Sequence, residues 1–467
     1  MKDRLRIWHL SEAYPPDYGG GAAVTTSEVC RSLADRGHEI RVLCVSGAGE
    51  PYSVHTDFDG DIQVDRVSLP YFKLKDPDGW QAGFAGWLRH QQRIDELIRQ
   101  FLAAWRPDIV DYHTVRPFGE QALKTIESEG ISISATLHEA WLTCLRLMLL
   151  KSPEVVPCSG PSPLKCLNCI YSHYDGSRLR AALKLSWRLP KLGVYPAYRF
   201  WKRSAARRRV NGAVARSEFM AQINRPHLAG RVDYIDLGID LKGAVKGQSD
   251  RKPGPIRFGF VGGFKSTKGI DHLLAAAKSL KQAGFQFELH VWGPGSTDDE
   301  ARQLVEGLED RVFLRGMYSI EERWSVFGEI DVALMATKVC EPLGRIPFEA
   351  AAVGVPTIGP AVGGVRETVK DEVDGLLYKF LDPKDLERQM KRVLTDPDLL
   401  PRLALNLPSI RDSRTAAAAL ESHYYSVLKA ANRSIRAGAS VGAVSAAPFS
   451  SPNNSITGMT PDSGDNR

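Results

Sequence analysis

The chain has 467 residues, of which 43% are hydrophobic and 25% are charged, so a fibrous or wholly disordered chain is excluded. This length has room for two or three domains, each with its own core. The formal net charge of +6 is unevenly distributed, because Arg178 to Arg209 holds eleven Lys or Arg and no Asp or Glu, which leaves 6 − 11 = −5 for the rest. A single basic segment indicates a local partner surface rather than a nucleic-acid-binding protein, and we expect no nucleic acid as a partner.

The start of the chain, MKDRLRIWHLSEAYPP, lacks the apolar core of a secretion signal and is typical of a first strand. No stretch approaches the roughly 20 apolar residues that span a bilayer. Seven cysteines are too few for a secreted disulfide scaffold. We therefore expect a cytoplasmic protein whose membrane association, if any, is peripheral.

Strand-like and helix-like segments alternate in the first half. The expected strands are LRIWHL, EIRVLCV, DIVDYH and SISATLH, and the helices between them include Val24 to Arg36 and Gln91 to Ala104. The rhythm restarts in the second half with IRFGFV, FQFELHVW, RVFLRG, DVALMA and VPTIG. This pattern predicts an α/β protein with two doubly wound, Rossmann-like parallel-sheet domains.

Composition sets the expected boundaries. Residues 241–255 are polar and rich in Gly and Pro, as in an interdomain linker, and they separate domains at 1–240 and 256–430. An insertion rich in cysteine and basic residues occupies about 141–209. Residues 434–467 are small and polar and are expected to form a disordered tail.

Ligands bind at the carboxyl ends of parallel strands, so the loops there are the candidate sites. Gly20 and Gly21 follow the first strand and precede a helix, an arrangement that lets backbone N–H groups approach an anion. In the second half, Gly263, Lys265 and Lys268 repeat the arrangement with cations for a diphosphate. The Walker spacing is absent, and a flexible turn or a surface lysine pair remains an alternative.

The segment CEPLGRIPFEAAAVGVPTIG carries two glutamates, Glu341 in a loop and Glu349 in the first turn of a helix. Because a carboxylate can accept hydrogen bonds from a vicinal diol, Glu349 suits a ribose and Glu341 a sugar hydroxyl. The N–H groups of Leu343 and Gly344 are expected to face a phosphate or the sugar. Compensation of the helix dipole is the alternative role of Glu349.

These segments together resemble glycosyltransferase family 4, the retaining enzymes of the GT-B fold, across about Arg4 to Ala430. The matching pieces are YPPDYGGG, RGHEIRVL, PDIVDYHT, TLHEAW, VARSEFM leading to LGID, VGGFKSTKGID, the two glutamates, GVPTIG and GGVRETV. The order and spacing of these pieces carry the resemblance.

The resemblance implies two domains facing a central cleft, with a nucleotide sugar, UDP- or GDP-linked, held by the C-terminal domain. It implies that Glu349 binds ribose, Glu341 the donor sugar and Lys268 the diphosphate. His138 matches the family's active-site histidine, and no cofactor is expected for catalysis. Gly263 departs from the pattern, since many relatives have arginine there, and Lys265 or Arg345 is expected to replace it.

Four cysteines, Cys144, Cys158, Cys166 and Cys169, cluster in the insertion and end in a C-x-x-C pair. A tetrahedral structural zinc site, a disulfide and free thiols all remain open. Between Arg178 and Arg209, basic residues alternate with aromatic ones, which favours an anionic membrane surface over a solvated helix.

We therefore expect a retaining, hexosyltransferase-like glycosyltransferase with a glycan or polyprenyl-linked acceptor, acting in cell-surface polysaccharide or glycolipid synthesis at the inner face of the membrane. Two alternatives remain. A nucleotide-sugar epimerase on the same fold would convert the donor without an acceptor, and a non-catalytic scaffold would bind the donor without turnover.

Overall fold

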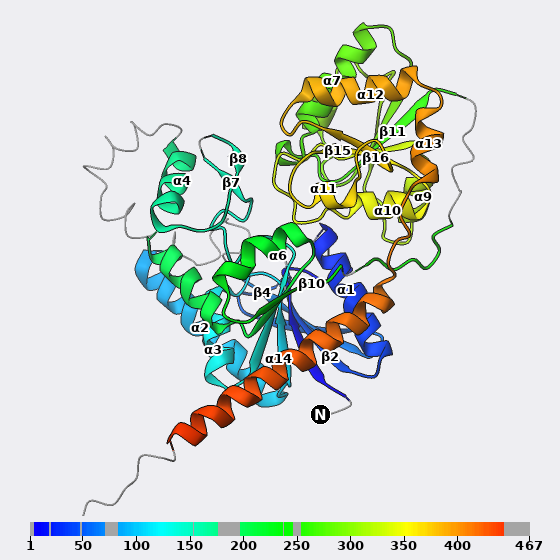
Figure 1. Ribbon diagram of the computed structural model, residues 1–467. Helices are drawn as coiled ribbons and strands as arrows, with labels where there is room; N and C mark the ends of the chain where they lie inside the picture. Colours follow the sequence, from blue (N-terminus) through cyan, green and yellow to red (C-terminus); the bar gives the residue numbers. More distant parts are fainter. Residues whose placement is uncertain are drawn as a thin grey trace, which may run out of the picture.

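The computed structural model describes residues 4–17, 20–46, 49–70, 83–152, 154–175, 197–236, 238–245 and 254–442. These residues form two α/β domains, each built on its own sheet (Figure 1). A two-stranded hairpin of β7 (Leu150–Lys151) and β8 (Val156–Pro157) stands apart from both sheets. Among the described residues, no helix is both long and apolar enough to cross a membrane.

The first sheet has eight strands in the order β10-β9-β6-β5-β1-β2-β4-β3. Every neighbouring pair is parallel except the antiparallel pair β3 and β4. The strands are β1 (Arg6–Leu10), β2 (Glu39–Ser46), β3 (Val54–Asp59), β4 (Ile62–Ser68), β5 (Ile109–Tyr112), β6 (Ser132–Leu137), β9 (Gly212–Ala215) and β10 (Arg231–Tyr234). The central strand β5 is buried along its whole length, as expected of a parallel strand covered on both faces.

Helices cover both faces of this sheet. One face carries α2 (Gly83–Ala104) and α3 (Gly119–Ser128), and the other carries α1 (Gly20–Asp35) and α14 (Ser413–Gly442). The remaining helices of this part are α4 (Pro163–Asp175), residues 197–209, α6 (Glu218–Asn224) and η3 (Arg225–His227). Two apolar cores therefore sandwich the sheet.

The second sheet has six parallel strands in the order β13-β12-β11-β14-β15-β16. They are β11 (Ile256–Val261), β12 (Phe287–Trp292), β13 (Val312–Gly316), β14 (Val332–Leu334), β15 (Thr357–Pro360) and β16 (Gly375–Tyr378). The helices are η4 (Ser266–Lys268), α7 (Ile270–Gln282), α8 (Asp299–Leu304), α9 (Arg323–Gly328), α10 (Ile346–Ala352), α11 (Val365–Thr368), α12 (Pro383–Thr395) and α13 (Leu399–Leu405). One core joins α7 and α12 to the sheet, and another joins α9 and α10 to its opposite face.

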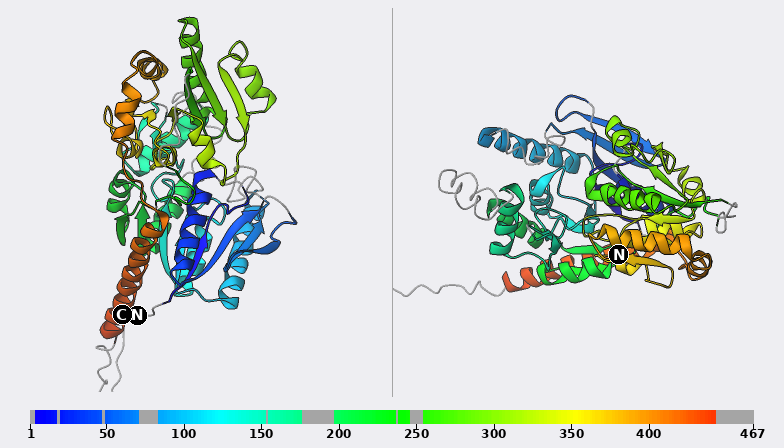
Figure 2. Two further views of the ribbon diagram at one scale, coloured as in Figure 1. Left: turned by 90° about the vertical axis from the view of Figure 1, so that its right-hand side faces the viewer. Right: turned by 90° about the horizontal axis from the view of Figure 1, so that it is seen from above.

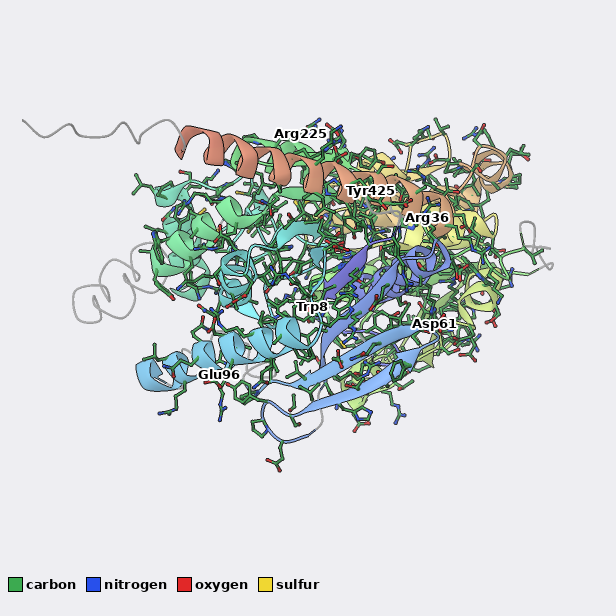
Figure 3. The ribbon with its side chains drawn as sticks, turned by 90° about the horizontal axis from the view of Figure 1, so that it is seen from below. Trp8, Arg36, Asp61, Glu96, Arg225 and Tyr425 are labelled. Carbon is green, nitrogen blue, oxygen red and sulfur yellow. The ribbon has the colours of Figure 1, made fainter. Side chains whose placement is uncertain are left out.

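The long helix α14 differs from the boundaries expected from sequence. It was assigned to the second domain as far as residue 430, but Leu420, Tyr424 and Val427 pack in the core of the first domain. Figure 2 shows α14 running alongside α1, and Figure 3 shows Arg36, just beyond α1, beside α14. Arg36 Nε donates to Glu421 Oε2 at 2.8 Å. The packed apolar face determines the domain to which this segment belongs.

The expected disordered tail at 434–467 is wrong in its first part, because α14 continues to Gly442. Extending an existing helix costs far less than nucleating one, so a small polar sequence can continue it. Residues 443–467 lie outside the described residues, as do 246–253 of the expected linker.

Candidate active site between the two domains

A buried ion-pair cluster joins the domains at the carboxyl edges of their sheets. Glu28 of α1 accepts hydrogen bonds from Arg345 Nη1 at 2.8 Å and Nη2 at 2.7 Å, and from Arg323 Nη1 at 2.6 Å. Burial opposes the charge on Glu28, but Arg345 and Arg323 lower the pKa of its carboxyl group. The sequence analysis did not predict either of these ion pairs of Glu28.

Arg345 also holds Glu349, the expected ribose ligand. Its Nε donates to Glu349 Oε1 at 2.6 Å, and its Nη1 donates to Thr25 Oγ1 at 3.0 Å. Burial opposes the charge on Arg345, whereas Glu349 and Glu28 raise the pKa of its guanidinium group. Glu349 is buried, so this glutamate and Arg345 form one charged unit at the start of α10.

Lys268 and Glu341 form a second charged unit nearby. Lys268 Nζ donates to Glu341 Oε1 at 2.7 Å, and Thr337 Oγ1 donates to the same oxygen at 3.1 Å. Lys268 ends η4 after β11, and Glu341 follows β14, so the two come from loops at neighbouring strand ends. The expected diphosphate cation thus contacts the expected sugar-binding carboxylate.

Tight backbone packing sets the shape of these loops. Gly269 has φ +78, and a Cβ there would lie 1.7 Å from the Ala336 carbonyl oxygen. Gly344 has φ +84, and a Cβ there would lie 2.8 Å from Met335 Cε. Both positions favour glycine because their backbone is left-handed, and at Gly269 the backbone carbonyl also leaves no room for a Cβ, whereas the flexible end of Met335 can move aside at Gly344. Leu343 is buried, so its side chain anchors the loop.

The glycine loop of the first domain reaches the same cluster. A Cβ on Gly21 would lie 3.5 Å from Arg345 Cδ, and Gly20 begins α1 with φ +67. In the second domain, Gly263 follows β11 and lies beside Lys265, the residue before η4. The structure therefore brings Gly21 against Arg345 and places Gly263 and Lys265 in the loop that leads to Lys268.

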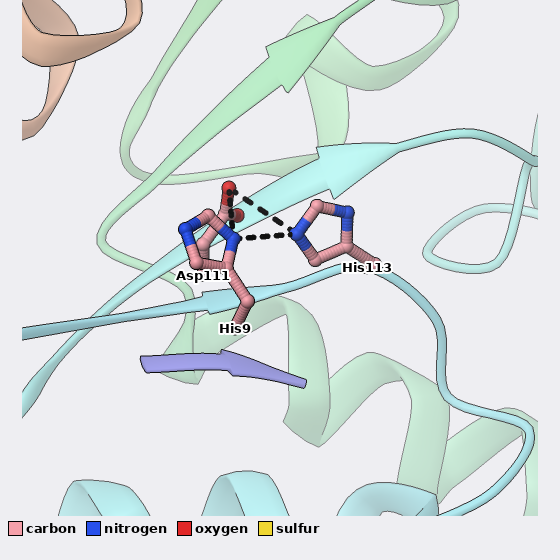
Figure 4. Close-up of side chains that lie close together, drawn as sticks. All are labelled: His9, Asp111 and His113. Carbon is pink, nitrogen blue, oxygen red and sulfur yellow. Dashed lines mark hydrogen bonds and ion pairs between the residues drawn. The ribbon is translucent and has the colours of Figure 1, made fainter. Parts of the chain in front are cut away.

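His138 follows β6 and belongs to a chain of three histidines. Its Nε2 lies 2.8 Å from His113 Nδ1, and the two rings stack with centroids 5.1 Å apart. His113 Nε2 in turn lies 2.9 Å from His9 Nδ1 (Figure 4). Each contact needs one ring hydrogen, so three neutral rings can make both bonds.

Burial keeps this chain neutral. Burial and the neighbouring His113 lower the pKa of His9 to about 3, and burial lowers the pKa of His113 to about 3. The pKa of His138 is lowered by burial and by the charges of His113, Arg216 and Arg345. Asp111 Oδ2 lies 3.8 Å from His9 Nδ1 and 3.6 Å from His113 Nε2.

Other donors also satisfy Asp111. Thr136 Oγ1 donates to its two carboxylate oxygens at 3.0 and 2.8 Å, and Tyr424 of α14 donates to Oδ2 at 2.6 Å. The sequence analysis predicted a role for His138 but not the contacts that join it to His113 and His9. Two histidines near the ends of predicted strands could have indicated this contact, because His9 and His113 stand at the ends of the neighbouring strands β1 and β5.

Arg216 is a further cation that sequence reasoning did not assign. It follows β9, is buried, and its Nη1 donates to Thr25 Oγ1 at 3.3 Å. Its Nε has no hydrogen-bond partner among the described residues. Burial and the charge of Arg345 lower the pKa of Arg216 to about 10. A buried cation with an unused donor is suited to an anionic ligand.

The four cysteines Cys144, Cys158, Cys166 and Cys169 belong to the insertion that follows His138 and not to the charged contacts described above. All four are free thiols and line one small cavity. The basic segment is described only from residue 197 onward, as a helix from 197 to 209 on which Trp201 is 62% exposed. Residues 178–196 of that segment lie outside the described residues.

Two parallel-sheet α/β domains with charged loops facing each other define the GT-B class of glycosyltransferase. A solved structure of Anabaena HepE in complex with UDP-glucose matches 93% of this chain and 100% of that one, with a TM-score of 0.54 and 16% identity. At this identity the likeness concerns the fold alone.

Two family descriptions match consecutive parts of the chain: Glycosyltransferase Family 4 over residues 19–242 and Glycosyl transferases group 1 over residues 243–407. The chain therefore belongs to the group 1, family 4 glycosyltransferases, as its motifs had indicated.

Curated relatives agree with this membership. The chain is 37% identical to 2-deoxystreptamine glucosyltransferase of Streptomyces kanamyceticus, over 31% of this chain and 37% of that protein. It is 27% identical to 2-deoxystreptamine N-acetyl-D-glucosaminyltransferase of Streptomyces fradiae, over 83% of this chain and 86% of that protein. The chain spans 37% of the length of 2-deoxystreptamine glucosyltransferase and 42% of that of another relative, alpha-D-kanosaminyltransferase of Streptomyces kanamyceticus.

Proposed function

We propose that this protein transfers a hexose from a nucleotide diphosphate sugar to a glycan or lipid-linked acceptor, with retention of anomeric configuration. The observation that carries the proposal is a set of charged contacts: Lys268 bonds Glu341, Arg345 bonds Glu349, and the charge of Arg345 lowers the pKa of His138 in the other domain. A UDP-sugar is the first donor to test, because HepE was solved with UDP-glucose, and GDP-sugars come next.

The ion pairs suggest how a donor binds. Lys268 is bonded to Glu341, so a diphosphate that attracts Lys268 frees Glu341 to accept hydrogen bonds from sugar hydroxyls. The diphosphate gains negative charge as it leaves, and cations fixed beside it stabilise that charge most in the transition state. In this proposal Glu349 accepts hydrogen bonds from the ribose, and Lys265 and Arg345 take the place of the arginine that relatives carry at the position of Gly263.

Arg216 adds a cation from the first domain to this set. Its unused Nε and its proximity to Arg345 favour contact with the donor diphosphate or with an anionic acceptor. His138 enters as a neutral ring, because burial lowers its pKa, and so acts as a hydrogen-bond partner of the transferred sugar rather than as a cation.

The proposed setting is synthesis of a cell-surface polysaccharide or glycolipid at the inner face of the membrane. Support comes from the basic segment 178–209 and from the exposed Trp201 on its described part, a combination that suits an anionic lipid surface.

A thermal-shift screen against UDP-, GDP-, ADP- and TDP-sugars, followed by product analysis, tests the reaction. A donor that binds the folded state preferentially raises the free energy of unfolding by about 2.7 kcal/mol at a concentration 100 times Kd. The melting temperature rises as a result. Retention is read from the anomeric configuration of the product. Donor turned into a different nucleotide sugar without acceptor would identify an epimerase, and binding without any turnover would identify a scaffold.

Variants test the site. We expect Glu349→Ala to weaken donor binding more than Glu341→Ala, and His138→Ala to reduce turnover with little loss of binding. Arg216→Gln is expected to raise the donor Kd about 10-fold, the effect of losing one charge-assisted hydrogen bond. Arg225→Gln is the matched control, because Arg225 is a surface arginine paired with Glu218. Unchanged binding and turnover in all four site variants would contradict the assignment.

A further inference from the structure

The part of the insertion that carries the four cysteines, residues 141–175, packs its large apolar side chains Trp141, Leu142, Leu149 and Leu150 into the core of the first domain. Its described part consists of the β7–β8 hairpin, the loops beside it and α4. Three non-glycine residues of this region have left-handed backbone, Leu147 with φ 68, Leu149 with φ 50 and Val155 with φ 51. Such conformations persist only where the surroundings fix them.

Four cysteines from three parts of this insertion surround one cavity. Cys144 comes from the loop after β6, Cys158 follows β8, and Cys166 and Cys169 lie on α4. The cavity has a volume of about 20 Å³. That volume is close to the room for a single small sphere, because one water needs roughly 10–15 Å³ by this measure.

Backbone N–H groups point at the sulfur atoms. Ser152 N lies 3.2 Å from Cys169 Sγ, and Ser162 N lies 3.4 Å from Cys166 Sγ. Cys144 Sγ accepts from the backbone of Leu149 and of Arg146. A neutral thiol is a weak acceptor, whereas a metal-bound thiolate carries the charge that such donors stabilise.

Basic side chains compensate the charge that four thiolates would bring. Arg146, Lys151 and Lys165 line the same cavity, and Arg146 Nη1 lies 3.5 Å from Cys169 Sγ. Four thiolates around a divalent cation carry a net charge of −2, which nearby cations offset. In a purely apolar pocket of free thiols, these cations would have no such role.

We propose that Cys144, Cys158, Cys166 and Cys169 bind one Zn²⁺ ion in a structural, tetrahedral site. The set of four thiolates is the ligand set that structural zinc sites use. No three of the four sulfur atoms lie within 4.8 Å of one another, so in this proposal bound Zn²⁺ draws them inward to Zn–S distances of about 2.3 Å.

The rival site is the group of His9, Asp111 and His113, whose ligand atoms all lie within 4.8 Å of one another. Those atoms already have partners, since the two rings bond each other and Asp111 accepts from Thr136 and Tyr424. The cysteines line a cavity, whereas the ligand atoms of the histidine group are already bonded to one another, to Thr136 and to Tyr424.

The zinc site lies on the path between the two domains. Cys144 is six residues beyond His138, and the Met148 carbonyl oxygen of the same loop accepts from Cys340 N at 3.3 Å. Cys340 precedes Glu341 in the second domain. Fixing Cys144 therefore also fixes a loop that links His138 to the neighbour of Glu341.

Metal content of the purified full-length chain tests this inference, whatever the reaction of the protein proves to be. We expect about one zinc per chain in the wild type, in Cys30→Ala and in His113→Gln, and loss of zinc in Cys166→Ser/Cys169→Ser. The Cys30 control removes a buried thiol outside the insertion. Zinc that survives in the double variant, or that disappears in His113→Gln, would overturn the proposal.

A measurement on the wild type covers the case in which the double variant does not fold. Cobalt-substituted protein is expected to show intense thiolate-to-metal charge-transfer absorption and the visible bands of tetrahedral Co²⁺. Under denaturing, chelating conditions without reductant, all seven cysteines should react as thiols. A cobalt spectrum without thiolate bands, or two fewer reactive thiols because of a disulfide, would refute the site.

Discussion

Glu28 of α1 and Arg345 at the start of α10 form a two-point ion pair, with distances of 2.7 and 2.8 Å, that joins the two domains. Both side chains are almost completely buried. The pair is connected on one side to Arg323 and on the other to Glu349. Interdomain geometry and the proposed donor site therefore share the same charges.

Removing the Glu28 carboxylate leaves two buried arginines without their shared counter-ion. Loss of one partner of a buried pair costs about 3 kcal/mol or more. We expect Glu28→Gln to lower the free energy of unfolding by about 3 kcal/mol in a urea titration. Glu96→Gln is the control, since it breaks only an exposed pair with Arg93 and should cost less than about 0.5 kcal/mol. Equal losses in the two variants would contradict a special role for Glu28.

The two buried histidines His9 and His113 are expected to make the free energy of unfolding decrease at acidic pH. His9 and His113 have a pKa of about 3 in the folded protein, compared with about 6.5 in an unfolded chain. Below pH 6.5 the unfolded chain takes up protons that the folded one does not. Their stabilising effect is thus complete above pH 6.5 and is lost as pH falls towards 3, by about 1.4 kcal/mol per pH unit for each ring.

Denaturant titrations between pH 6.5 and 5 measure this loss. We expect a shallower decline with falling pH in His9→Gln than in the wild type, because one of the two titrating rings is gone. The surface variant His55→Gln, on β3, should follow the wild-type profile. Parallel profiles for wild type and His9→Gln would show that the ring does not titrate in this way.

Tyr424 links α14 to the central strand of the first domain. Its hydroxyl group donates to Asp111 Oδ2 at 2.6 Å in a fully buried position. Tyr424→Phe leaves the carboxylate with one donor fewer, and we expect a loss of about 1.5 to 3 kcal/mol of stability. The matched change Tyr234→Phe, at a residue that is 47% exposed, should alter stability by less than about 0.5 kcal/mol. Calorimetric or denaturant unfolding distinguishes the two.

Gly269 and Gly284 both have left-handed backbone, but only Gly269 also lacks space for a Cβ. Their φ values are similar, 78 and 84, but a Cβ on Gly284 meets nothing within 4 Å, whereas one on Gly269 meets the Ala336 carbonyl at 1.7 Å. Gly284→Ala should cost about 1 to 2 kcal/mol, the cost of left-handed backbone. Gly269→Ala should cost clearly more and weaken donor binding, because it displaces the adjacent Lys268. Comparable stability and donor affinity in both variants would show that the backbone at Gly269 can move away from the Ala336 carbonyl at little cost.

Sequence predicted β1, β2, β5 and β6 of the first sheet and β11 to β15 of the second, because buried parallel strands are continuous apolar runs. It did not predict β3, β4, β9, β10 or β16. Glu341 and Glu349 were predicted from their places in a loop and in the first turn of a helix, and His138 from the resemblance to family 4; their roles stay predictions. Sequence did not predict that Glu28 faces Arg345 or that His9 lies beside His113, since both pairs form only when distant strands or separate domains meet. Arg216 was overlooked because one arginine after a short strand carries no periodic signal.

The C-terminal boundary of the second domain was missed for a related reason. The pattern of α14 shows an amphipathic helix but not which sheet it covers, and the choice is made by the shape of the apolar surface next to α1. Local periodicity identifies an element, and tertiary packing assigns it to a domain.

The return of α14 to the first domain has a consequence for the order of synthesis. The ribosome completes β1 to β10 long before it makes residues 413–442, yet Leu420, Tyr424 and Val427 complete one of the two cores around that sheet. During synthesis of the second domain, the face of the first sheet that α14 covers therefore remains exposed. A chain stopped before Ser413 would keep that face exposed and be prone to aggregation, although every strand of both sheets would be present.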